Sequence, residues 1–298
     1  MATMAPDTSK RRLNIPPSAF LRVNADRALR RRRCVVEYDG ADFCGFQAQD
    51  QPSMMRTVQE VIEDALRRTT GETLPRLRFA SRTDTGVHAL GQVVVFSSAC
   101  LEPDRVFRDA LNTRLPKDVL CRSMTTMSEA EAAFDPCADA TRKRYVYEIV
   151  AGGLRPVLGR QHVWHVRKPL DVAKMQVAVA LLTAPPATKD FSSFTPQKNG
   201  DGDKDNVCTL STIELHAETL GIQENTNFDE DTGTRIRLVF EGNRFRYKMV
   251  RNLVGTLVDV GLGKFTPNDI SSILAAKSRA RAGQGAPPQG LTLVWIKY

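Results

Sequence analysis

The sequence lacks any apolar run of the length that a membrane-spanning helix needs. No stretch of its 298 residues approaches the ~20 consecutive apolar side chains that span a bilayer. Hydrophobic residues make up 42% of the chain and charged residues 26%, a balance typical of folded globular proteins. We therefore expect no membrane partner and a core large enough for two domains.

Cysteine pairs with metal-site or redox spacing are also missing. The six cysteines are scattered without a C-x-x-C, and no secretory pattern precedes them. His162 and His165 form an H-x-x-H, but nearby Pro169 and strand-type neighbours argue against a helical pair of ligands, so we predict no metal site. Buried free thiols in a reducing, intracellular compartment are the expectation.

Nucleotide-binding motifs are incomplete. Gly261-Leu262-Gly263-Lys264 lacks the upstream glycine of a phosphate-binding loop, and Gly283-Gln284-Gly285 has Pro288 where a dinucleotide fold has its third glycine. No Ser-His-Asp or Cys-His pattern of a covalent hydrolase is present. We expect no nucleotide cofactor and no other cofactor.

Positive charge is concentrated at the start of the chain. Residues 1–33 hold nine basic and two acidic side chains, while the other 265 residues hold 33 basic and 32 acidic ones. A short basic helix over residues 18–31 fits the spacing of its apolar residues. Such an arm is typical of polyanion binding, of a nuclear address or of a transit segment to a mitochondrion or plastid. The expected location is therefore intracellular, with cytoplasm, nucleus, mitochondrion and plastid as the alternatives.

The order of predicted elements indicates an α+β fold. From Cys34 to Thr125 the patterns alternate as β-α-β-β-α-β, including a Thr57–Glu60 capping box that opens the first helix. The second half is again built from strands and helices, and Asp171 is predicted to cap a helix that runs to about Thr183. We expect two ferredoxin-like or RRM-like modules with mixed, mainly antiparallel sheets side by side, helices on one face and an active-site cleft between them. The predicted parts are a basic arm at 1–33, disordered or used for targeting, and modules at 34–135 and 136–298.

Residues 81–91, Ser-Arg-Thr-Asp-Thr-Gly-Val-His-Ala-Leu-Gly, gather unusual chemistry in one loop. A guanidinium (Arg82), a carboxylate (Asp84) and an imidazole (His88) lie within seven positions, just before the strand residues 93–96. Loops held between strands commonly display reacting groups. The alternative is an ordinary polar turn in which Asp84 bonds its own backbone.

Two other stretches carry basic residues among aromatic ones. Arg142–Tyr147 alternates them on a predicted strand, which suits a surface that follows phosphates and stacks on bases, although a solvated basic edge is the simpler alternative. A helix predicted over 245–261 would align Arg244, Lys248 and Arg251 on one face. Arg251 falls in an apolar segment and needs a carboxylate partner, for which Asp84 is a candidate.

Several ordered motifs resemble the TruA-type tRNA pseudouridine synthases. Residues 81–89 resemble the family's catalytic motif, and the similarity runs in order over residues ~34–298. The further matching segments are Glu37-Tyr38-Asp39-Gly40, Gly45-Phe46-Gln47, Val58-Gln59-Glu60, Arg142–Tyr147, Phe191-Ser192-Ser193-Phe194, Met249-Val250-Arg251-Asn252 and the strand after Gly290.

The resemblance implies an isomerase that converts specific uridines of tRNA to pseudouridine without a cofactor, as a homodimer. Asp84 would attack C1′ or remove a ribose proton, Arg251 would hold Asp84 ionised and oriented, and Tyr145 would stack on the target base. Arg82 would fill the space left by the extruded base. The predicted RNA-binding residues are Arg82, His88, Arg142, Lys143, Arg144, Arg244 and Lys248.

Two alternatives from other classes stay open at this stage. One is a catalytically inactive RNA-binding protein of the same fold. The other is a glycosidase-type hydrolase that releases free uracil.

Overall fold

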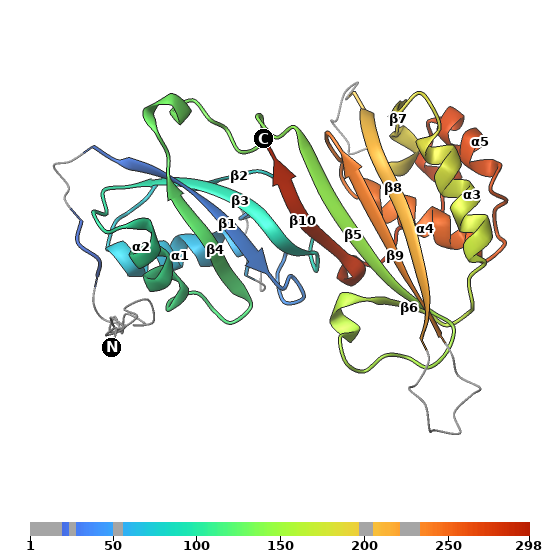
Figure 1. Cartoon of the computed structure of the whole chain (residues 1–298), viewed down its shortest axis with the longest axis horizontal. Helices are drawn as coiled ribbons and strands as arrows, with labels where there is room; N and C mark the ends of the chain where they lie inside the picture. Colours follow the sequence, from blue (N-terminus) through green and yellow to red (C-terminus); the bar gives the residue numbers. More distant parts are fainter. Residues whose placement is uncertain (1–19, 24–27, 50–55, 197–204, 221–232) are drawn as a thin grey trace, which may run out of the picture.

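The computed structural model describes residues 20–23, 28–49, 56–196, 205–220 and 233–298. The start of the basic arm, for which the sequence predicts a disordered or targeting segment, lies outside the described residues. The described part is an α+β fold built on one large, mixed and mainly antiparallel sheet (Figure 1). Its strands run in the order β4-β1-β3-β10-β5-β9-β8-β7, with β2 added to β3 and β6 added to β5.

The first half follows the predicted alternation of strands and helices. Its elements are β1 (Arg30–Tyr38), α1 (Val58–Thr70), β2 (Arg78–Phe79), β3 (His88–Ser98), α2 (Asp104–Asn112) and β4 (Val119–Thr126). The predicted capping box is confirmed, since the Thr57 side chain accepts from Glu60 N and the Glu60 carboxylate accepts from Thr57 N. Gly71 ends α1 in the left-handed conformation, with φ of 75°.

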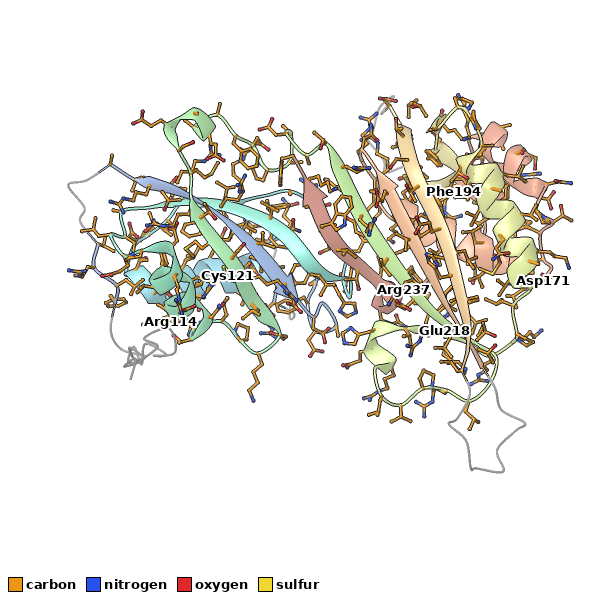
Figure 2. The ribbon with its side chains drawn as sticks, viewed as in Figure 1. Arg114, Cys121, Asp171, Phe194, Glu218 and Arg237 are labelled. Carbon is orange, nitrogen blue, oxygen red and sulfur yellow. The ribbon has the colours of Figure 1, made fainter. Side chains whose placement is uncertain are left out.

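The second half supplies the other strands and the remaining helices. Its elements are β5 (Arg142–Ala151), β6 (Trp164–Val166), α3 (Val172–Thr183), β7 (Thr188–Asp190), β8 (Val207–Leu220), β9 (Gly233–Gly242), α4 (Met249–Gly261), α5 (Asp269–Ala276) and β10 (Leu291–Lys297). Asp171 caps α3 as predicted, its carboxylate accepting from Lys174 N at 3.0 Å (Figure 2).

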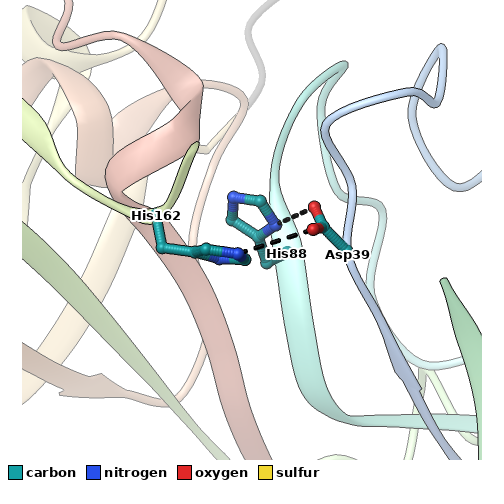
Figure 3. A group of neighbouring side chains, drawn as sticks. All are labelled: Asp39, His88 and His162. Atoms are coloured by element: carbon teal, nitrogen blue, oxygen red, sulfur yellow. Dashed lines mark ion pairs between the residues drawn. The ribbon is translucent and has the colours of Figure 1, made fainter. Parts of the chain in front are cut away.

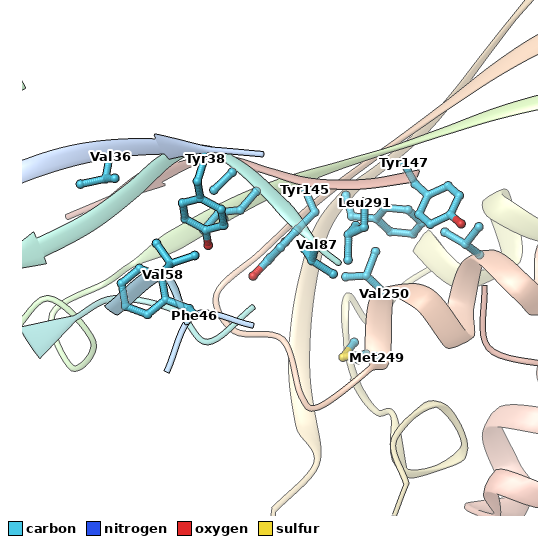
Figure 4. Packing of buried hydrophobic residues seen from close by; sticks show 14 of the residues in the cluster. Val36, Tyr38, Phe46, Val58, Val87, Tyr145, Tyr147, Met249, Val250 and Leu291 are labelled. Atoms are coloured by element: carbon cyan, nitrogen blue, oxygen red, sulfur yellow. The ribbon is translucent and has the colours of Figure 1, made fainter. Parts of the chain in front are cut away.

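The core lies between the sheet and the helices. In β5 the residues Lys143, Tyr145, Tyr147 and Ile149 are buried, while Arg142 and the residues between these four are half-buried, so the predicted alternation is confirmed over residues 142–149. Figure 4 shows that the tyrosines of β5 point to the same side of the sheet as Met249 of α4. One face of the sheet therefore carries the helices and the larger part of the buried apolar surface.

The last strand, β10, lies in the middle of the sheet. It pairs antiparallel with β5 and, through Thr292 and Leu293, in parallel with the start of β3. Gly91 makes the approach between β3 and β10 possible, because a Cβ there would lie 2.4 Å from Val294 O. The end of the chain thus joins strands from both halves. The division into modules at residue 135 stays a prediction, since the sheet runs through β3, β10 and β5 without a break.

The first strand begins earlier than predicted. Arg30 and Arg31 belong to β1 and pair with β3, so the helix predicted over residues 18–31 is wrong at these positions. The physical reason is visible at Arg32, which is fully buried. Its Nε donates to the Asp104 carboxylate at 3.1 Å and its Nη2 to Cys100 O at 2.9 Å. The final arginines of the basic arm are therefore strand residues rather than a free tail.

No helix among the described residues is long and apolar enough to cross a membrane.

Candidate active site

The Asp84 loop joins β2 to β3 and is held along its length by the segment after β1. Phe46 N donates to Thr83 O at 3.1 Å, and Gly86 N donates to Phe43 O at 3.3 Å. Gly45 has φ of +86°, and a Cβ there would lie 2.8 Å from Thr83 O, so glycine is required for this close approach. The loop turns at Asp84, whose carbonyl accepts from Val87 N at 3.1 Å.

Two buried polar side chains, Tyr38 of β1 and Gln92 of β3, bind the loop, and the sequence assigned neither of them a role. The hydroxyl of Tyr38 lies 2.7 Å from Thr83 Oγ1. Gln92 is fully buried; its Oε1 accepts from Ser81 N at 3.2 Å and its Nε2 donates to Ser81 O at 2.6 Å. A glutamine beside the apolar run 93–96 was the available signal, because a buried polar side chain needs partners.

Arg251, in the first turn of α4, pairs with Asp84. Its Nη1 donates to Asp84 Oδ2 at 3.1 Å, and the two side chains are 15% and 22% exposed. Its Nε donates to Ala286 O at 2.8 Å. The predicted carboxylate partner of Arg251 is confirmed, and the carboxylate keeps some access to solvent while the guanidinium fixes its direction.

Tyr145 lies beside this pair, on the buried face of β5. Its hydroxyl lies 3.0 Å from Ser81 Oγ, and the edge of its ring faces Phe245 with centroids 5.1 Å apart. Burial raises the pKa of Tyr145 to about 12, with a smaller upward contribution from the Asp84 charge and an opposing one from the Ser81 hydrogen bond. The hydroxyl is therefore protonated near neutral pH and is able to donate a hydrogen bond.

Arg82 and His88, both predicted to bind RNA, have different surroundings. Arg82 is exposed, and its side chain forms no ion pair or hydrogen bond with any other described residue. His88 is 3% exposed, and both of its ring nitrogens contact the protein. Of these two residues, Arg82 is the one whose side chain is exposed to solvent at the loop.

The basic residues of β5 point in two directions. Lys143 is buried, donates from Nζ to Ala80 O at 2.9 Å, and burial lowers its pKa. Arg142 and Arg144 lie on the opposite face of the strand from Tyr145 and pair with the buried carboxylate of Glu241. The structure therefore does not bring the guanidinium groups of β5 together with Asp84.

The predicted alignment of basic residues on α4 is wrong, because the helix begins at Met249 rather than near residue 245. Lys248 precedes it in the left-handed conformation, with φ of 57°. Arg244 turns away to pair with Asp205 and donates from Nε to Val207 O at 3.0 Å. Of the three arginine and lysine residues expected on one helix face, only Arg251 is in α4 and at the Asp84 loop.

The fold and the site together define the class of this protein. It is an α+β protein in which a partly exposed carboxylate, paired with an arginine and flanked by a buried tyrosine, lies where two halves of one sheet meet. Proteins of similar sequence identify the family.

A family model described as tRNA pseudouridine synthase matches residues 34–135 and 188–298, which include Asp84 and Arg251. The chain is 38% identical over 271 residues to a tRNA pseudouridine synthase A of Oceanobacillus iheyensis, covering 91% of this chain and 97% of the relative. It is 39% identical over 270 residues to the protein of that name from Brevibacillus brevis, covering 91% and 100%. A third, from Anaplasma marginale, is 38% identical over 268 residues, covering 90% and 100%. The chain belongs to the tRNA pseudouridine synthase family, and its members are isomerases.

Proposed function

We propose that this chain converts uridine in tRNA to pseudouridine, with the Asp84 carboxylate as the reacting group. The observation that carries the proposal is the 3.1 Å ion pair between Asp84 and Arg251, residues 167 positions apart in the chain. Both lie in the segments that match the family model. Such a pair, with its carboxylate partly exposed, suits a group that must meet a ribose rather than one that only stabilises the fold.

The reaction is an isomerisation, so atoms balance within the nucleotide. The N1–C1′ bond breaks, the base turns, the C5–C1′ bond forms, and the hydrogen of C5 is replaced by one on N1. Asp84 acts at the junction of ribose and base, either by attacking C1′ or by removing a ribose proton. A primary isotope effect with ribose-deuterated uridine is expected only when a C–H bond of the sugar breaks.

The family resemblance supports roles for Tyr145 and Arg82. The ring of Tyr145 is expected to stack on the target base, and its protonated hydroxyl is a hydrogen-bond donor 3.0 Å from Ser81 Oγ of the Asp84 loop. A uridine inside folded RNA must leave its stack, which costs a few kcal/mol. Arg82, exposed at the edge of the loop, is the residue that we expect to occupy the vacated space.

The test replaces Asp84 by asparagine, which keeps size and removes charge. Incubation with uridine-labelled tRNA should give binding with a rate of pseudouridine formation lowered by about 10²–10⁴-fold or more. Asp64→Asn is the matched control, because Asp64 is an exposed carboxylate on α1 that pairs with Arg67 and Arg68. Full activity of the Asp84 variant would refute the assignment.

Chromatography of the digested RNA separates this function from the two alternatives. Pseudouridine supports an isomerase, free uracil indicates a hydrolase, and unchanged uridine with retained binding indicates an inactive RNA-binding protein.

We further propose that the protein acts as a homodimer inside the cell. The family resemblance supports the dimer, and the six free cysteines support a reducing compartment. Sedimentation at micromolar concentration should give twice the mass of one chain. A monomer that keeps full activity would refute the dimer.

A further inference from the structure

Three titratable side chains gather beside the Asp84 loop but outside the Asp84–Arg251 pair. Asp39 follows β1, His88 begins β3, and His162 ends the short helix η3 (Arg160–His162). The Nδ1 of His88 lies 2.9 Å from Asp39 Oδ1, and the Nε2 of His162 lies 3.5 Å from Asp39 Oδ2 (Figure 3). Asp39 and His162 are the titratable groups that face the buried imidazole from the segments around it.

The partners of His88 determine where its ring carries hydrogen. Nε2 lies 3.0 Å from Gln161 O and 3.1 Å from Gln289 O, and carbonyl oxygens only accept, so Nε2 must carry the hydrogen. Two groups compete for Nδ1: Gly40 N, at 3.0 Å, donates to a lone pair there, whereas Asp39 Oδ1, at 2.9 Å, accepts a hydrogen from it. With either partner of Nδ1, Nε2 carries a hydrogen that it donates to the carbonyls. Both nitrogens are thus engaged, and His88 has no lone pair left for a metal ion.

The groups around His88 act on its pKa in opposite directions. Burial lowers the pKa of His88, the Asp39 charge opposes that effect, and His162 adds to it. The net direction is downward from 6.5, so the ring holds a second proton less readily than a free imidazole does.

One carbonyl partner of His88 belongs to the segment that orients Arg251. Ala286 O accepts from Arg251 Nε at 2.8 Å, and Ala286 N donates to Arg251 O at 2.9 Å. Three residues on, Gln289 receives the bond from His88. Between them Pro288 lies against the Asp84 loop, because a Cβ on Gly86 would be 2.9 Å from Pro288 Cγ.

The other nitrogen of His88 connects the same loop to the end of β1. Gly40, which donates to Nδ1, is pressed against the loop: a Cβ there would lie 1.9 Å from Val87 O. His88 therefore contacts, with one ring, the segment that supports the loop and the segment that orients the arginine.

We propose that His88 is a positioning residue, whose Nε2–H ties the Asp84 loop to residues 286–290 and so sets Asp84 against Arg251. This replaces the RNA-binding role that the sequence predicts for His88, and it rests on the proposed function of Asp84. A misplacement of about 1 Å is enough to cost 10²-fold in rate, so loss of this bond should be visible in catalysis.

Two substitutions of His88 distinguish the contact made by Nε2 from the contact made by Nδ1. In His88→Gln the side-chain amide reaches the position of Nε2 and continues to donate to the carbonyls. In His88→Asn the amide ends near Nδ1, so the contact with Gly40 is kept and the donor to Gln289 is lost. Neither side chain titrates.

The measurement is the rate of pseudouridine formation under single-turnover conditions, with KM for tRNA determined in parallel. We expect His88→Asn to lower kcat at least tenfold with KM within about twofold, and His88→Gln to restore kcat to within about fivefold of wild type. His216→Gln is the control, since His216 is an exposed histidine of β8 that pairs with Glu214, and this variant should match wild type.

Several outcomes would overturn the proposal. An Asn variant with wild-type kcat would do so, as would an Asn variant impaired only in KM, which is the result expected of an RNA contact. Equal loss in Gln and Asn variants would show a general packing role instead.

A spectroscopic measurement does not depend on activity. The ¹⁵N resonances of histidine-labelled protein at pH 7 should show a ring with hydrogen on Nε2 that is absent from both His88 variants. A His88 ring with hydrogen on Nδ1 alone would refute the assignment even if the enzyme makes pseudouridine. If the wild type makes none while this spectrum is found, it is the proposed function that fails.

Discussion

Replacing Arg251 by lysine should slow the reaction although the positive charge is kept. The arginine uses two nitrogens in two directions, Nη1 toward Asp84 and Nε toward Ala286 O. A lysine ammonium is a single point on a flexible stem and is unable to occupy both positions. One of the two hydrogen bonds is therefore lost, and Asp84 loses its fixed orientation.

The size of the effect follows from the bond that is lost. A hydrogen bond to a charged group contributes about 1.5–3 kcal/mol. With about 1.36 kcal/mol per tenfold change in rate, this corresponds to roughly 10- to 150-fold in kcat. Because Asp84 is 22% exposed and Arg251 15%, water weakens the pair somewhat and we expect the lower half of that range.

The assay is single-turnover formation of pseudouridine at saturating tRNA, with KM measured separately. Arg237→Lys is the matched control: Arg237 of β9 pairs with Glu148 and is 59% exposed, so its substitution should change kcat by less than about twofold (Figure 2). Wild-type kcat in the Arg251 variant would refute the argument that the guanidinium orients Asp84. A change confined to KM would refute it as well and indicate an RNA contact.

Two further predictions concern the surroundings of the loop. Gly40→Ala should lower both kcat and the melting temperature, because its Cβ would meet Val87 O. Gly159→Ala is the control, since Gly159 has a positive φ but open space around it. If Gly159→Ala lowers kcat and the melting temperature more than Gly40→Ala does, the steric argument is wrong. The free energy of unfolding should also depend on His88: its folded pKa lies below the ordinary 6.5, so the unfolded chain binds more protons, and this contribution is complete above pH 6.5 and lost as pH falls through the folded pKa. Urea titrations at several pH values between about 5 and 8 give the free energy of unfolding at each pH. This free energy should rise less steeply with pH in His88→Gln than in wild type, and parallel curves for the two proteins would contradict the prediction.

Local patterns were sufficient to predict a large part of the fold. The capping box at Thr57, the cap at Asp171 and the alternation of β5 depend on residues within a few positions of one another, and the structure confirms all three. Such signals act over short distances, through hydrogen bonds of one turn or through the two faces of one strand. The predictions failed where distant partners decide. β1 takes in Arg32 because Asp104 and Cys100 receive its guanidinium.

The same contrast holds for the basic residues. On sequence alone Arg142, Lys143, Arg144, Arg244 and Lys248 were equivalent candidates for RNA contact. Side-chain direction and burial distinguish them, since Lys143 points into the core while Arg142 and Arg144 pair with Glu241 on the other face. A pattern of charges gives no information about which carboxylates the fold will bring near.

The sequence by itself determined the strand and helix order from Cys34 to Thr125, the family resemblance and Asp84 as the candidate reacting carboxylate. These follow from periodicity and from an ordered set of short motifs. Only the tertiary structure decided that Arg251 lies 3.1 Å from Asp84 and that His88 joins the loop to residues 286–290. The reason is the position of β10, the last strand, between β3 and β5. Its insertion brings the segment before it against the loop, a contact between residues some 200 positions apart that no local pattern encodes.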